Sequence, residues 1–503
     1  MAEEKVPPFF ILPSELIHHV LTFLPLKDLL TVGLVNRALL NHSRQDTLYH
    51  AFVQFNVPGS SVPKPEHLTW RELFKLHHPY WFIPKNKIWF ADIPFLGKLL
   101  IARYDHRLNA IEAYALVAER RQPTFQTWER NPDAIIHTFH PRVQLDLNTA
   151  SVRLDKDGYE NATGELGYRL RKEIPMSAYH GAGLHSRLML TKPWPQHITT
   201  QATPIWPPLT IPSPSRARND SPTHFRDPVH RPAVLSELST ANFRLKRWVE
   251  FSSLRMRVGE DITTWATLPE ECYTPTPMKP WQGIWCGDYA GHGCEFLVVM
   301  QPDSPKPLPQ RAEWALRTRE REGSVSSDGS WSTAPTGTDE WTDSFQPGDE
   351  ESSIMGASIS TLQASPEATT SKPGDEVVEA EDDSFYRGRI EAVKLTGDVN
   401  VPRGEYSFIA PDIGPNGLIR IATEDPFKGA RIVKSVGHIA ARGFRDGKCT
   451  RVRQTTIAKT LPDDYMTSQL ILVSHDRIAQ YWETFGHVSY YQRVDIDEFT
   501  KIT

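Results

Sequence analysis

The sequence predicts an α+β protein, in which a small N-terminal three-helix unit precedes a mainly antiparallel β-barrel with disordered inserts. Apolar residues recur at helical spacing in the first fifty residues, and beyond about Pro79 they alternate with polar ones between turn residues. Two stretches with few apolar runs interrupt this alternation without changing it. We therefore expect the helical unit at residues 8–55, a connector at 56–78 and the β-barrel domain at 79–503.

The helical unit opens at Leu12-Pro13-Ser14-Glu15, where a proline and a serine can start a helix. The apolar side chains of this first helix fall on one face: Leu16, Ile17, Val20, Leu21 and Leu24. Pro25 ends the helix, Asp28 can cap a second one, and a third follows Asn36-Arg37. Some forty residues make only a small core, so apolar surface left over here needs a partner or the rest of the chain to cover it.

The β-barrel domain is predicted from twelve short runs with strand character. They are Lys87–Ala91, Lys98–Tyr104, Ala110–Ala118, Phe243–Phe251, Glu295–Met300, Tyr386–Leu395, Glu405–Ala410, Gly417–Ile421, Ala430–Val436, Gln469–Ser474, Ile478–Trp482 and His487–Val494. Glycine and proline at the ends of the runs indicate turns. One barrel that includes all of these strands is the expected arrangement.

Two inserts are predicted within this domain. Residues 203–240 form a proline-rich insert with eight prolines in its first thirty residues, which prevents a continuous helix or ladder. Residues 303–384 form an acidic insert, in which residues 323–384 carry 14 acidic side chains and a single basic one, Lys372. Such a composition cannot bury enough apolar surface to offset the entropy of ordering, so we expect disorder.

The composition also argues against several classes of protein. Four cysteines, Cys272, Cys286, Cys294 and Cys449, are too few for a disulfide framework and match no zinc-site spacing. The first residues lack the pattern of a signal peptide, and no apolar run approaches ~18 residues. No G-x-S-x-G, H-E-x-x-H or Walker motif occurs. We expect a cytoplasmic or nuclear protein, with no membrane segment, cofactor, metal or catalytic activity of its own.

The N-terminal pattern resembles an F-box, the segment through which a substrate receptor binds the Skp-type adaptor of an SCF ubiquitin ligase with its cullin. The resemblance rests on two Leu-Pro pairs, an Ile/Leu-rich helix and a Val-Asn-Arg segment at its end. It implies the following adaptor-binding residues: Leu12, Pro13, Leu16, Ile17, Leu21, Leu24, Pro25, Leu29, Leu34 and Val35. A small helical unit with surplus apolar side chains suits helix-in-groove association, although helices that only pad the barrel are the plainer explanation.

Two segments resemble the C-terminal domain of the F-box-only protein thirty-one family. These are Gly287-x-Tyr289-x-x-His292-Gly293-x-Glu295 and Lys394-x-Thr396-Gly397-Asp398-x-Asn400-x-Pro402. The resemblance implies a substrate receptor whose barrel binds proteins to be ubiquitinated, often through their C-terminal ends. The expected substrate-binding residues are Tyr289, His292, Glu295, Thr396, Asp398, Asn400 and Trp482.

Residue chemistry adds a hypothesis about which chain ends would bind. Glycines that flank Tyr289 and His292 let a backbone approach a ligand closely. An ionised Asp398 accepts hydrogen bonds from an amide and repels a carboxylate, which favours a neutral, amide-like end. The plainer explanations are a turn cap for Asp398 and Asn400, a bulge for the glycines, and core positions for Tyr289 and Trp482.

Two other functions remain alternatives at this point. One is a β-barrel that binds or processes a small apolar ligand beneath a helical lid. The other is nucleic-acid binding by the basic segment around Arg244, Lys246, Arg247 and Trp248. Because a strand would divide these charges between its two faces, a solvated strand edge or a patch that meets the acidic insert is the favoured explanation, and no nucleic acid is expected as a partner.

Overall fold

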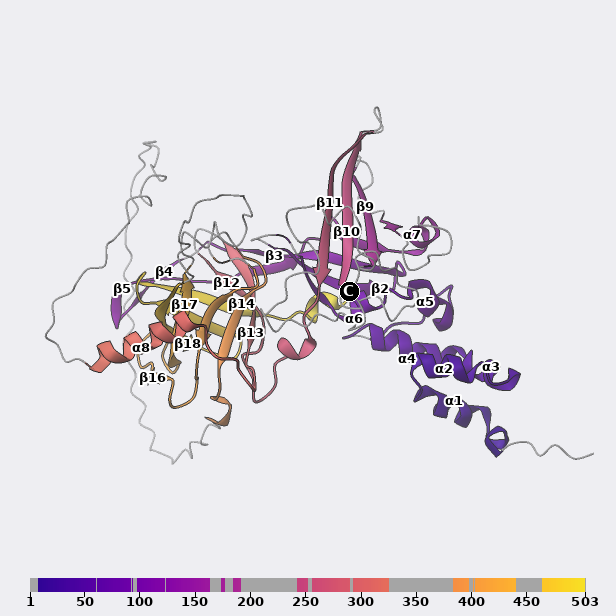
Figure 1. Ribbon diagram of the computed structural model, residues 1–503, viewed down its shortest axis with the longest axis horizontal. Helices are drawn as coiled ribbons and strands as arrows, with labels where there is room; N and C mark the ends of the chain where they lie inside the picture. Colours follow the sequence, from indigo (N-terminus) through magenta and orange to yellow (C-terminus); the bar gives the residue numbers. More distant parts are fainter. Residues whose placement is uncertain are drawn as a thin grey trace, which may run out of the picture. The chain divides into compact units, whose positions relative to one another are not determined.

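The computed structural model describes residues 8–59, 61–91, 93, 97–122, 124–162, 173–176, 184–190, 242–251, 256–289, 293–324, 383–397, 401, 403–439 and 464–502. The proline-rich insert predicted at 203–240 lies outside these residues, as does the acidic insert beyond residue 324. Everything below concerns the described residues, whose element labels are those of Figure 1.

The N-terminal unit begins as predicted and ends differently. Its helices are η1 Pro8–Ile11, α1 Ser14–Thr22, α2 Leu26–Val32, α3 Arg37–Ser43 and α4 Asp46–Asn56. The single third helix of the prediction is two helices, because Gln45 adopts an extended backbone (φ −61°, ψ 133°) that ends the first of them. Asn36 caps α3, since its side-chain oxygen accepts a hydrogen bond from the Leu39 amide at 2.9 Å.

The predicted connector at 56–78 contains a helix, α5 Trp70–His77, and α6 Phe82–Lys85 follows it. A capping box starts α5: the Thr69 hydroxyl accepts from the Glu72 amide, and the Glu72 carboxylate accepts from the Thr69 amide. This Thr-x-x-Glu signal was visible in the sequence. α5 buries one face against α4 and the following strands.

The β-domain contains two sheets rather than one. The first is nine-stranded and runs in the order β6 Arg142–Leu145, β3 Ala110–Glu119, β2 Leu99–Asp105, β1 Ile88–Ala91, β11 Met256–Ala266, β10 Asn242–Phe251, β9 Leu184–Leu190 and β8 Ile174–Pro175, with β7 Val152–Leu154 beside β3. β10 lies between β9 and β11 and is therefore not the solvated edge expected for its basic residues; the Arg244 side chain is fully buried.

The predicted antiparallel barrel is confirmed. Its eight strands are β12 Gly283–Asp288, β13 Cys294–Met300, β14 Ile390–Lys394, β15 Tyr406–Ala410, β17 Arg431–Ile439, β18 Asp464–Leu472, β19 Arg477–Trp482 and β20 His487–Val494. Pairing of β12 with β20 closes the ring. Outside it, β16 Leu418–Ile421 pairs with β17, and the hairpin of β4 Phe125–Trp128 and β5 Asn131–His137 joins β20 through β5.

The barrel therefore accounts for less of residues 79–503 than predicted. The strands from β1 to β11 form the nine-stranded sheet, except for the β4–β5 hairpin. Periodicity cannot assign a strand to a sheet, and here both faces of the first sheet are apolar. Trp89 and Leu100 pack against the N-terminal helices, while Phe90 and Ile101 pack against the outer wall of the barrel.

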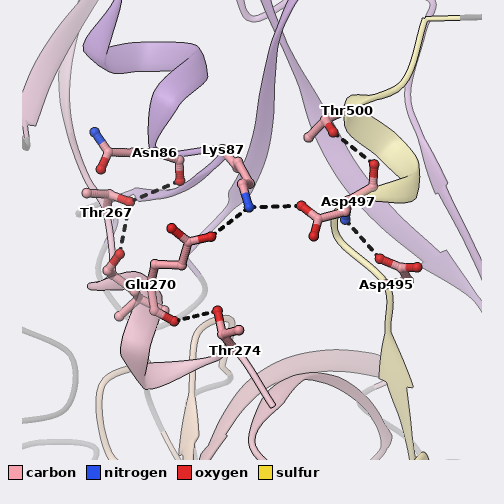
Figure 2. Close-up of polar contacts among 9 residues, drawn as sticks. Asn86, Lys87, Thr267, Glu270, Thr274, Asp495, Asp497 and Thr500 are labelled. Carbon is pink, nitrogen blue, oxygen red and sulfur yellow. Dashed lines mark hydrogen bonds and ion pairs between the residues drawn. The ribbon is translucent and has the colours of Figure 1, made fainter. Parts of the chain in front are cut away.

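The helices, the first sheet and the barrel thus form one contiguous unit, with a third core inside the barrel around Trp285, Leu297 and Phe408. Two ion pairs of Lys87 stabilise the contact between the first sheet and the barrel domain (Figure 2). Its ammonium lies 2.8 Å from the Glu270 carboxylate, in the short helix η5 Glu270–Cys272, and 2.9 Å from Asp497, which follows β20. Lys87 has φ 57°, in the left-handed region.

The predicted start of the acidic insert, residue 303, is too early in the chain. α8 Gln310–Ser324 occupies its start, and Ala312 and Ala315 pack on the outer wall of the barrel against Ile409 and Val436. The apolar residues among 312–316 give this segment a face to bury, which the averaged composition of the insert obscured. The remaining helices of the described residues are α7 Lys156–Glu160, η7 Asp383–Phe385 and η8 Glu498–Thr500. Among the helices that the structure describes, none combines the length and apolar character needed to cross a membrane.

Candidate functional site

A cluster of polar side chains lies on the barrel strands near the predicted substrate-binding segment. Lys394 of β14 and Glu295 of β13 form an almost fully buried ion pair, with Nζ 2.6 Å from the carboxylate. The ammonium also lies 4.0 Å from the centre of the Tyr289 ring, a cation–π contact. Mutual neutralisation leaves this pair with no net charge to offer a ligand.

Hydroxyl groups surround the ion pair. The Tyr289 and Ser407 oxygens are 2.6 Å apart, and the Tyr491 ring meets that of Tyr289 edge-on. Burial raises the pKa values of both Tyr289 and Tyr491, so both phenols are neutral at physiological pH. Neutral hydroxyls both donate and accept hydrogen bonds, which suits a neutral polar group on a ligand.

Two glycines make room for aromatic rings in the barrel wall. A Cβ added to Gly287 would lie 2.6 Å from the Tyr491 ring, and one added to Gly437 would lie 2.1 Å from the Trp482 ring. Both distances are shorter than any normal contact. Gly287 is therefore a close-packing position rather than the bulge considered from the sequence.

The structure brings some of the predicted substrate-binding residues together. Tyr289 and Glu295 both contact Lys394, and the Thr396 hydroxyl accepts a hydrogen bond from the Phe296 amide at 2.8 Å. Trp482 is a buried wall residue, whose indole donates to the Ser489 hydroxyl at 3.1 Å. The other three, His292, Asp398 and Asn400, lie outside the described residues.

The sequence prediction missed Ser407 and gave no role to Lys394. Lys394 lay in the quoted Lys-x-Thr-Gly-Asp segment, so that segment could have drawn attention to it. Ser407 carries no local signal: it reaches Tyr289 only because β15 pairs with β14 in the barrel. Across the described residues, no three His, Cys, Asp or Glu side chains gather as a metal-binding group.

A second candidate surface lies on the N-terminal helices, where large apolar side chains face solvent. Leu16 is 50% exposed and Leu34 85% exposed. Other exposed apolar residues of the unit are Ile11, Leu12, Val20, Phe23, Leu30 and Val35. So many exposed apolar residues on one small unit indicate an interaction surface.

The two candidate surfaces lie in segments that match two different protein families. Residues 9–54 match the F-box-like family, and this range covers α1 to α3 and nearly all of α4. The N-terminal helices form an F-box-like domain. Residues 265–498 match the family described as Cyclin D1 binding domain, a range that contains all eight strands of the closed barrel. No curated protein matches the chain.

The F-box-like domain divides the predicted adaptor-binding residues between its surface and its core. Ile17, Leu21 and Leu29 are buried in the core of the domain, so a direct contact of these side chains with an adaptor stays a prediction. They form the inward stripe of α1 and α2, and helical periodicity alone does not say which stripe faces the core. The following residues are exposed: Leu12, Pro13, Leu16, Pro25, Leu34 and Val35. Leu24 is half-buried.

Proposed function

We propose that this protein is the substrate-recognition subunit of an SCF-type ubiquitin ligase, acting in the cytoplasm or nucleus. The F-box-like domain would bind a Skp-type adaptor and, through it, the cullin, while the barrel would bind the protein to be ubiquitinated. The chemistry of ubiquitin transfer would belong to other subunits. The apolar surface of the F-box-like domain is the observation that carries this proposal.

The shape of that surface supports adaptor binding. Leu16 on α1 faces solvent, as do Leu34 and Val35 after α2, while Ile17 of α1 is in the core. Helices that only covered the rest of the chain would not need these exposed apolar side chains, so the exposure supports a partner. A helical domain with such a face suits docking against a partner helix.

Co-purification from cells tests the adaptor proposal. We expect the native chain to retain the adaptor and cullin, and a Leu16→Asp/Leu34→Asp variant to lose them, because two charges would be buried in the interface. Phe125→Asp/Phe485→Asp is the matched control, since both phenylalanines are similarly exposed but belong to the β-domain. Equal retention by all three chains would contradict the proposal.

For the barrel, we propose that it binds C-terminal ends of protein substrates, with a preference for neutral, amide-like ends. The support is the neutral hydroxyl cluster of Tyr289, Ser407 and Tyr491 beside the Lys394–Glu295 ion pair. The name of the family matched by residues 265–498 indicates that its members bind a cyclin, and we extend protein binding to this chain on that basis. The small-ligand alternative is not favoured, because Trp285, Leu297 and Phe408 fill the barrel interior.

Peptide titration tests the preference. Peptides identical except for an amide or acid end would be titrated against the native chain, Tyr289→Phe and Asp398→Asn. We expect tighter binding of the amide, a loss of about three- to tenfold on removal of the Tyr289 hydroxyl, and a reduced preference for the amide in Asp398→Asn. An unchanged preference in Asp398→Asn would count against the role of that carboxylate.

A further inference from the structure

A cavity of about 870 Å³ lies between the F-box-like domain and the elements that follow it. Its walls come from the end of α1, from α4, from α5 and α6, and from Leu190 at the end of β9. Trp81, Phe74 and Phe82 are its buried aromatic lining residues, while Phe23 and Phe55 are exposed. A volume of this size with aromatic walls and few polar groups is typical of small-molecule sites.

The lining of the cavity carries positive but no negative charge. None of its lining residues is acidic. Among these described residues, Lys85 is the only lysine, and there is no arginine. The Lys85 ammonium lies 3.9 Å from the centre of the Phe55 ring, and within the described part of the chain it has no carboxylate partner. Desolvation by neighbouring side chains lowers the pKa of His78, so this lining residue is mainly uncharged at neutral pH.

The remaining polar groups are largely engaged within the helices. The amide groups of Asn56 and Asn86 each donate to a backbone carbonyl one turn earlier, on Phe52 and Phe82, at 2.7 Å. The ammonium of Lys85 is therefore the strongest hydrogen-bond donor that the cavity offers. An anionic group would be stabilised beside it, and an apolar body would be stabilised by the aromatic walls.

We propose that this cavity binds an amphipathic carboxylate, with the carboxylate on Lys85 and a fatty-acyl or aromatic body between Phe55, Phe74 and Trp81. The site overlaps the predicted adaptor-binding residues only at Leu24 and Pro25, because Leu16, Leu34 and Val35 do not line it. It would place a small metabolite at the point where the F-box-like domain meets the rest of the chain.

Calorimetric titration of the full chain with decanoate and with 1-decanol tests the proposal, since the two share an apolar tail and differ in charge. We expect saturable decanoate binding that Lys85→Met weakens about five- to tenfold, while decanol binding is unchanged. Lys75→Met is the matched control, since Lys75 is an exposed lysine of α5 outside the cavity, and it should leave both ligands unaffected.

A second pair of variants locates the binding. Ala51 is an exposed lining residue of α4, and Thr47 lies one turn earlier, also exposed, outside the lining. Ala51→Trp should narrow the cavity and weaken both ligands, and Thr47→Trp should not. Equal decanoate affinity in the native chain and Lys85→Met would overturn the proposal, as would the absence of saturable binding. Loss of adaptor binding in Ala51→Trp with decanoate binding intact would assign the groove to the adaptor and overturn it too.

Discussion

His77 shows how a single buried side chain can make the stability of this fold sensitive to acid. The ring is fully buried on α5, with Nδ1 2.9 Å from the Tyr159 hydroxyl and the rings of Trp81 and Tyr104 around it. Burial lowers the pKa of His77 to about 3. An unfolded histidine has a pKa near 6.5. Between this pH and about 3, the unfolded chain therefore binds a proton at His77 that the folded chain does not bind.

The sign of the pH effect follows directly. The contribution of His77 to stability is fully present above about pH 6.5 and is lost as the pH falls towards 3, by about 1.4 kcal/mol per pH unit at most. We predict that His77→Gln, which keeps a partner for Tyr159, lowers stability at pH 7 but flattens its decline between pH 6.5 and 4. Denaturant unfolding at several pH values measures this. A decline as steep as in the native chain would show that other groups cause it.

At the scale of elements, each of the twelve predicted strands overlaps an observed strand, because alternation and turn residues act locally. The strands that were not predicted are β4 to β9, β11 and β12. β11 contains Gly259, Glu260 and Asp261 in its middle, and a register shift in β10 lies opposite. β4 to β7 are short and mainly polar on their exposed sides. β5 also pairs with β20, and β11 pairs with β1; these partners are distant in the chain, and no local pattern shows them.

For the candidate sites, as for the strands, the sequence predicted which segments are involved but not which residues contact one another. The apolar stripes of the F-box-like domain were found, but Leu16 and its neighbour Ile17 lie on opposite sides of the core boundary, which only packing decides. Likewise, Tyr289 was predicted as a ligand residue, whereas its hydroxyl contact with Ser407 spans 118 residues of sequence. Contacts between strands of one ring are set by register, and register was not predictable here.

α8 offers a prediction at this scale. Because Ala312 and Ala315 are its buried contacts with the barrel wall, Ala315→Asp should release the helix by placing a charge against Val436 and Tyr465. Hydrogen exchange should become faster in α8 and remain slow in β17 and β18. Arg311→Asp, on an exposed position of the same helix, is the control and should leave α8 protected. Faster exchange in the barrel strands would mean that α8 is needed for the barrel itself.

For the whole molecule, the Lys87 ion pairs are the feature that joins the first sheet to both ends of the barrel domain. Burial acts to lower the pKa of Lys87, but its hydrogen bonds with Glu270 and Asp497 outweigh burial and raise it above the ordinary value. A raised lysine pKa contributes stability that is complete below about pH 10.4 and is lost as the pH rises through the folded value.

We predict that Lys87→Met lowers the free energy of unfolding by about 1–2 kcal/mol at pH 7. Lys87 has φ 57°, and methionine, which like lysine is unbranched at Cβ, bears a similar cost of this left-handed backbone, so the comparison isolates the charge. Glu270→Gln/Asp497→Asn should reproduce most of the loss, and combining all three changes should add little to it. Additive losses would show that the two carboxylates act independently of Lys87.

The pairing of β12 with β20 has a consequence for synthesis on the ribosome. β12 ends at Asp288 and its partner β20 begins at His487, so the ring cannot close until β20 has been translated. Until then β12 has an unpaired edge, and such edges attract other chains. An mRNA truncated before the codon for residue 487 would therefore yield a protein with the F-box-like domain but with an open barrel, whose unpaired β12 edge could bind other chains. Under the proposed function, such a product would compete for the adaptor without delivering a substrate.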